Sequence, residues 1–63
     1  MKSFVLELRD SKVFYINETS EKRAALKALL ISDEESSEIY YLIEERTGRR
    51  VINIKLDYQS IHG

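Results

Sequence analysis

The sequence predicts a single small α+β domain over residues 1–63, an antiparallel sheet with one main helix. Three observations lead to this class. Two segments near the N-terminus have strand-forming patterns, a central segment carries apolar residues at helical spacing, and residues 51–58 alternate apolar and polar side chains. The chain has no linker rich in Gly, Ser or Pro, and its 63 residues fall below the size at which chains divide into domains.

The first element expected is a β-hairpin. In residues 3–8, SFVLEL, the apolar side chains Phe4, Leu6 and Leu8 alternate with Ser3, Val5 and Glu7, which is the period of a strand. The turn-forming pair Asp-Ser follows within residues 9–12. Residues 13–16, VFYI, then supply β-branched and aromatic side chains. The two segments together therefore predict two antiparallel strands.

The next element is a helix over residues 20–31. Asn17, Thr19 and Ser20 are all competent N-caps, and the residues after them are rich in Ala, Leu, Lys and Arg, which lose little entropy in a helix. The predicted apolar face consists of Ala25, Leu26, Leu29 and Leu30. This face is expected to cover one side of the sheet.

Residues 32–46 admit two interpretations. Ser32 followed by three acids resembles a capping box, which with Gly48 as a C-terminal stop gives a second helix and the order β-β-α-α-β. However, residues 39–43, IYYLI, are consecutively apolar, and a helix with that sequence would be apolar on all sides. A short aromatic and β-branched run flanked by charges is more typical of a strand. We therefore favour the order β-β-α-β-β.

The last predicted element, residues 51–58, pairs with the preceding strand. Ile52, Ile54, Leu56 and Tyr58 share one side and Val51 lies on the other. A two-residue loop at Thr47-Gly48 sets Ile43 opposite Ile52. A three-residue loop with Gly48 in the left-handed region instead brings Glu44 opposite Arg50. Both registers are chemically reasonable.

Composition excludes several classes of function. The chain has no cysteine, which removes disulfides and thiolate metal sites and favours a reducing, cytoplasmic setting. Its one histidine, His62, leaves little material for a metal site or for proton transfer. No segment has the length of a signal peptide core or a membrane span. We therefore expect no enzyme, no cofactor, no metal and no membrane contact.

The segment EERTGRR, residues 44–50, has two interpretations. As a turn, Thr-Gly reverses the chain and the glutamates face the arginines. As a site, Arg46, Arg49 and Arg50 form an anion clamp, which suggests nucleic-acid binding with help from Lys55. The net charge of −1 argues against a dedicated nucleic-acid binder, although the charge is uneven. Residues 17–45 carry eight acids and three bases, whereas residues 46–63 carry four bases and one acid.

The tyrosines have two interpretations, of which we favour the first: they cover apolar area of the sheet while their hydroxyls stay in water, or they form an interface. The chain has four tyrosines and no tryptophan, and one short helix is too narrow to cover a four-stranded sheet. The uncovered side or a strand edge would then contact a second copy or another protein. The sequence therefore predicts a small intracellular, regulatory protein-binding module, a homodimer or an adaptor, with a nucleic-acid-binding domain as the alternative. The predicted partner contacts are Tyr40, Tyr41, Arg46, Arg49 and Arg50.

Overall fold

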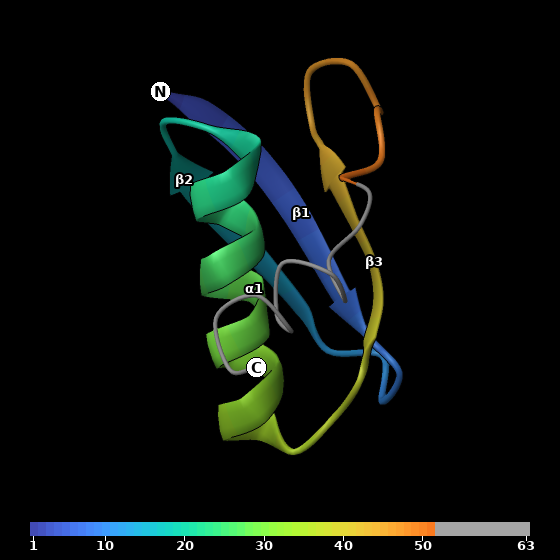
Figure 1. The fold of residues 1–63 in the computed structure, drawn as a ribbon. Helices are drawn as coiled ribbons and strands as arrows, with labels where there is room; N and C mark the ends of the chain where they lie inside the picture. Colours follow the sequence, from blue (N-terminus) through green and yellow to red (C-terminus); the bar gives the residue numbers. More distant parts are fainter. Residues whose placement is uncertain (52–63) are drawn as a thin grey trace.

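The computed structural model describes residues 1–51 and contains one helix and three strands in the order β-β-α-β. The elements are β1 (Lys2–Leu8), β2 (Val13–Glu18), α1 (Glu21–Glu35) and β3 (Ile39–Glu44). The strands form an antiparallel sheet in the order β2-β1-β3, and α1 lies across one face of it (Figure 1). The α+β class and the single helix are thus confirmed. The predicted final strand, apart from its first residue, lies outside the described residues.

The predicted hairpin is β1 and β2, which pair from Lys2 opposite Glu18 to Glu7 opposite Val13. The Leu8 N–H donates to the Lys12 carbonyl and the Ser11 N–H donates to the Leu8 carbonyl, both at 3.0 Å. Ser11 adopts a left-handed φ of 74°. A three-residue loop whose last residue is left-handed sustains the right-handed twist of the two strands, and this explains the tight turn.

Helix α1 begins as expected, because the Ser20 side chain accepts a hydrogen bond from the Arg23 N–H. It ends four residues later than predicted, at Glu35 instead of residue 31. The acids after Ser32 continue the same helix, and no second helix forms over residues 33–46. Ser36 stops the helix with a left-handed φ of 53°, and the N–H groups of Ser36 and Ser37 return to the carbonyls of Asp33 and Ser32.

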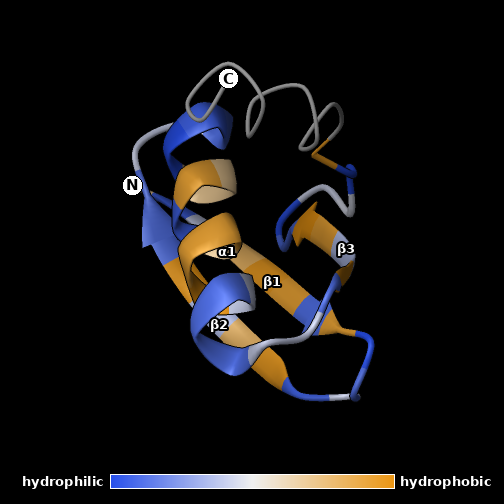
Figure 2. Cartoon of the chain, turned by 60° about the horizontal axis from the view of Figure 1, so that its bottom comes forward, coloured by the Kyte–Doolittle hydropathy of each residue, from blue (hydrophilic) through white to orange (hydrophobic). Residues whose placement is uncertain are grey.

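The face of α1 that contacts the sheet differs from the prediction. Small side chains are buried there, namely Ala24, Ala25 and Ala28. Leu30 is 64% exposed, and the other two leucines of the predicted face are only half-buried. The sheet presents large side chains toward the helix, so alanines opposite them let the two layers approach closely. Figure 2 shows hydrophobic residues in the middle turns of α1 and hydrophilic residues at both of its ends.

The core contains Phe4, Leu6 and Leu8 from the central strand, together with Ile16 and Leu42 from its neighbours. All five side chains are at least 99% buried. Val51, the last described residue, joins the core as well, with 8% exposure. Its N–H donates to the Leu42 carbonyl at 2.8 Å, so its backbone lies beside β3.

The chain reverses after β3 in a register that neither predicted loop matches. Ile43 pairs with Arg50, and the Glu44 N–H donates to the Arg49 carbonyl at 2.8 Å. Residues 45–48 are therefore the loop, one residue longer than the longer alternative. Gly48 does adopt the left-handed region, at φ 70°, and its N–H donates to the Glu44 carbonyl at 2.7 Å. Because of this extra loop residue, Arg50 pairs with Ile43 and not with Glu44.

Candidate functional site

The side chains that do not contact the helix gather on the opposite side of the sheet, which we call the open face. Residues that alternate with the core positions of β1 and β2 reach it, and β3 adds two more. They are Ser3, Val5, Glu7, Val13, Tyr15, Asn17, Tyr41 and Ile43. Among residues 1–51, no helix covers this face. Tyr15 is 73% exposed on it.

A β-bulge in β3 determines how its two adjacent tyrosines point. Glu7 pairs with Tyr41, but the next residue of β1, Leu8, pairs with Ile39, so β3 carries one extra residue, Tyr40. In a regular strand, Tyr40 and Tyr41 would point to opposite faces. With the bulge, Ile39 packs against the core and Leu42 is buried, while both tyrosines between them stay outside. Their ring centroids are 5.5 Å apart.

Charged side chains accompany these rings. The Tyr41 hydroxyl donates to Oε1 of Glu7 at 3.0 Å, and Cζ of Arg9 lies 5.4 Å from the centroid of the Tyr40 ring. The hydrogen bond to Glu7 is the main reason that the pKa of Tyr41 is raised, followed by burial and the negative charge of Glu7. We call Glu7, Arg9, Tyr15, Tyr40 and Tyr41 the tyrosine cluster.

The predicted arginines lie elsewhere. The tyrosines stand at the beginning of β3, whereas Arg46, Arg49 and Arg50 follow its end (Figure 1). The three residues from Tyr41 to Glu44 alone span about 10 Å of extended strand. The structure therefore separates Arg46 and Arg49 from the two tyrosines, whereas Arg50 pairs with Ile43, two residues from Tyr41 in β3.

The arginine segment is built as a turn. Besides the backbone bonds across Gly48, the Thr47 hydroxyl donates to Glu44 Oε1 at 3.3 Å and accepts from the Arg49 N–H at 3.2 Å. Arg46, Arg49 and Arg50 are all exposed. Arg49 Nε lies 3.8 Å from Oε1 of Glu21, at the beginning of α1, so one guanidinium already has an acidic neighbour.

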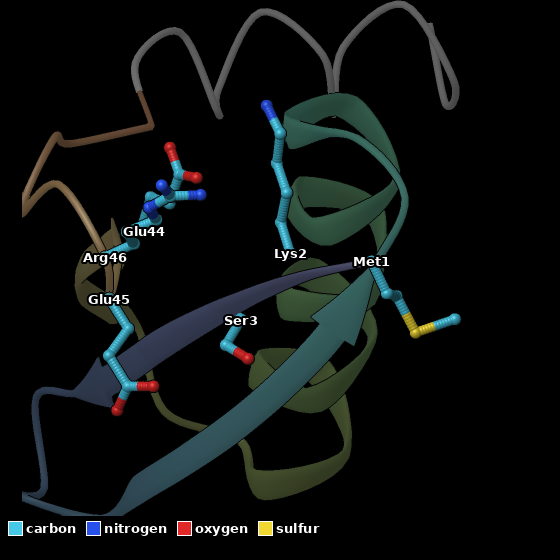
Figure 3. Close-up of a pocket in the computed structure, with 6 residues that line it drawn as sticks. All are labelled: Met1, Lys2, Ser3, Glu44, Glu45 and Arg46. Atoms are coloured by element: carbon cyan, nitrogen blue, oxygen red, sulfur yellow. The ribbon is translucent and has the colours of Figure 1, made fainter.

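A pocket adjoins this turn and combines both signs of charge. It is lined by Met1, Lys2 and Ser3 at the beginning of β1 and by Glu44, Glu45 and Arg46 after β3 (Figure 3). Figure 3 shows Glu44 and Arg46 pointing to one side of the chain, while Glu45 points to the other. The charged side chains that line the pocket balance, with Lys2 and Arg46 against Glu44 and Glu45.

Metal binding and membrane insertion find no support in the described part of the chain. Within residues 1–51, no group of three or more acidic, histidine or cysteine side chains is arranged to hold a metal ion. No helix in that part of the chain is long and apolar enough to cross a membrane.

Sequence reasoning identified two members of the tyrosine cluster as contacts and missed three. Glu7 and Tyr15 could have been added from the sequence, because the alternation in β1 and β2 already places them opposite the core residues. The bulge that brings Tyr40 beside Tyr41 has no Gly or Pro to signal it. Arg9 depends on the same bulge, since its partner is Tyr40.

Fold and site together define a small sheet-and-helix domain with an exposed aromatic cluster that carries one acid, Glu7, and one base, Arg9. Comparison with known protein families, with characterised proteins and with solved structures finds nothing that matches the chain.

Proposed function

We propose that the chain is a small cytoplasmic protein-interaction module that binds a protein partner through the tyrosine cluster. The observation that supports it best is the bulge, which turns two adjacent tyrosines outward beside Glu7 on the open face. Tyr15 and Tyr40 are 73% and 53% exposed, although tyrosine rings are usually partly covered. Tyrosine is enriched at interfaces because its ring buries a large area while its hydroxyl keeps a hydrogen bond. The absence of cysteine is the reason for the cytoplasmic setting.

The chemistry of the cluster suggests what the partner presents. The Glu7 carboxylate accepts one hydrogen bond, from Tyr41, and a carboxylate can accept several more. Arg9 already lies 5.4 Å from the Tyr40 ring, so a cation of the partner would be attracted by the Glu7 carboxylate and by the negative faces of the Tyr15 and Tyr41 rings. We therefore propose a partner surface that places a lysine or arginine against Glu7 and apolar side chains over the tyrosines. A regulatory role by masking such a surface follows from this mode of binding, and it requires no catalytic step.

Site-specific photo-crosslinking tests the proposal. A benzophenone amino acid is placed at Tyr40 in one variant and at Leu30, an equally exposed apolar residue on α1, in the control. We expect a protein crosslinked from Tyr40 and none from Leu30. Binding of the purified partner should then weaken about 10-fold or more with Tyr41→Ser or Glu7→Gln and stay unchanged with Leu30→Ala. Equal crosslinking at both positions, or affinity indifferent to Tyr41→Ser, would overturn the proposal.

A nucleic-acid-binding function is the alternative, because Arg46, Arg49 and Arg50 are exposed on one turn. Lys55, the fourth predicted contact, lies outside the described residues. An amide-resolved NMR titration with short single- and double-stranded oligonucleotides separates the two functions. Salt-sensitive shifts confined to the arginine turn, lost with Arg50→Ala, would favour nucleic acid. Unmoved amides at these positions would leave the turn as structure only.

A further inference from the structure

Strand β2 is the edge of the described sheet, and the direction of its backbone groups can be assigned. The Ser3 carbonyl accepts from the Glu45 N–H, so the odd-numbered residues of β1 direct their backbone groups toward β3 and the even-numbered ones toward β2. Their partners in β2 are Phe14, Ile16 and Glu18. The backbone groups of the intervening residues therefore point away from the sheet. These residues are Val13, Tyr15 and Asn17.

A second copy of β2 can use all of these groups in one register. Antiparallel pairing about a two-fold axis at Tyr15 sets Tyr15 opposite Tyr15 and Val13 opposite Asn17 of the second copy. Each such pair exchanges two backbone hydrogen bonds. Moving the axis to Phe14 or Ile16 leaves one outward-pointing residue without a partner. The pairing is isologous, so it closes as a dimer and does not continue into a filament.

The charges at the ends of β2 match in this register. Lys12, just before the strand, falls opposite Glu18 of the second copy. Each residue is already held by its own helix: Lys12 Nζ lies 2.6 Å from Oε1 of Glu35, and Glu18 lies 3.4 Å from Nε of Arg23. The hydrogen bond to Glu35 raises the pKa of Lys12, which keeps the ammonium charged. Opposite charges on directly opposed residues favour strand pairing, whereas like charges oppose it.

Helix α1 repeats this complementarity. Its β2 side is basic in the N-terminal half, where Arg23 and Lys27 approach Glu18, and acidic at the other end, where Glu35 meets Lys12. A two-fold axis perpendicular to the sheet sets the basic half of one helix beside the acidic end of the other. Because α1 contacts all three strands, its axis runs near β1. The helix axes of the two copies would then lie about 14 Å apart, wider than the 8–10 Å of directly packed helices, so they do not collide.

We propose that the chain forms a two-fold homodimer in which two β2 edges join the sheets, with both helices on one face. The partner is a second copy because backbone geometry, the end charges and the helix charges agree on one self-complementary register. The joined open faces form a surface with two tyrosine clusters, and Tyr15 of each copy meets at its centre. This proposal rests on the edge of β2, whose central residue Tyr15 also belongs to the tyrosine cluster. Dimerisation of the Tyr15 variants and partner binding of Tyr41→Ser are separate measurements, so the two proposals can fail separately.

Tyr15→Pro is the test of the edge. Proline removes only an N–H that points away from β1, and it is tolerated on an edge strand, so the hairpin survives. Sedimentation equilibrium should show the wild-type chain as a concentration-dependent dimer and Tyr15→Pro with a dissociation constant raised at least 10-fold. The control Tyr15→Val removes the ring but keeps the N–H, and it should still dimerise. A wild-type chain that stays monomeric at all concentrations, or a Tyr15→Pro chain that dimerises like wild type, would overturn the proposal.

A charge exchange tests the register. Lys12→Glu or Glu18→Lys alone sets like charges opposite each other and should weaken the dimer, whereas the double variant restores opposite charges between copies and should recover it. The contacts of these residues with their own helix are broken in the double variant as well. If the double variant dimerises again while its thermal stability stays lowered, the recovery of the dimer comes from the contact between the two copies. A double variant that dimerises no better than the singles would refute this register.

Discussion

Ser36, which ends α1, is strained in a way that glycine would relieve. Its φ of 53° lies in the left-handed region, where the Cβ of an L-residue approaches the following carbonyl oxygen. The backbone conformation is needed, because it allows the N–H groups of Ser36 and Ser37 to bond the last carbonyls of the helix. The Ser36 side chain is exposed, and within residues 1–51 it makes no hydrogen bond that glycine would lose.

The magnitude follows from two opposing terms. The left-handed conformation costs an L-residue about 1–2 kcal/mol. Glycine in turn loses about 0.5–1 kcal/mol more backbone entropy when the chain folds. Ser36→Gly should therefore raise the free energy of unfolding by about 0.5–1 kcal/mol. For a domain of this size, 1 kcal/mol corresponds to about 4–8 °C in Tm, so the gain should be about 2–8 °C.

Thermal and urea unfolding followed by circular dichroism measure this gain. Ser37→Gly is the matched control: the φ of Ser37 is not positive, and its hydroxyl accepts from the Asp10 N–H at 3.3 Å. That variant gains nothing from left-handed freedom and loses a hydrogen bond, so it should be less stable than wild type. Equal effects of the two substitutions, or a Ser36→Gly protein less stable than wild type, would refute the reasoning.

Three further predictions concern the site, the core and the turn. The pKa of Tyr41 is raised, so its neutral form is favoured in the folded state, and its contribution to stability is full below pH 10 and falls as the pH rises through the folded pKa. Glu7→Gln should lower the folded pKa, which NMR titration of the Tyr41 ring measures. An unchanged pKa would remove the Glu7 contact as its cause. Leu6→Ala, in the centre of the core, should cost about 2–5 kcal/mol, and a urea midpoint equal to wild type would contradict the packing described. Gly48→Ala should cost about 1 kcal/mol because of the left-handed φ alone, since no neighbouring atom lies within 4 Å of a Cβ built there. Gly48→Asn should cost less, because asparagine adopts the left-handed region more readily. Equal costs of the two substitutions would show that φ is not the reason.

The regular part of the fold could be predicted from the sequence because it depends on local patterns. Alternation in β1 and turn residues before β2 define the hairpin, and the N-cap at Ser20 defines where α1 begins. The end of α1 could not be read in the same way. Serine is not a usual left-handed residue, so Ser36 gave no stop signal, and the acids before it suggested a new beginning.

The wrong helix face and the missed bulge have a common physical origin. Both depend on what the neighbouring layer offers and not on the segment itself. Leucine is more apolar than alanine, but the helix residues buried in the core with Phe4 and Leu6 are Ala24, Ala25 and Ala28, of which only Ala25 was on the predicted face. Likewise, the run in β3 is too uniformly apolar to show which residue is extra, and the pairing with Leu8 decides it.

The place of β1 at the centre of the sheet has a consequence for how the chain is made. Ribosomes deliver these elements in order, so β1 meets β2 almost at once but must wait for β3. Ile39 follows Leu8 by 31 residues in the sequence, and translating them at about 5–20 residues per second takes roughly 2–6 s. During that interval one side of the hairpin has unpaired backbone groups, and α1 has only part of its supporting surface. The unpaired side of the hairpin is therefore covered only when β3 closes the sheet.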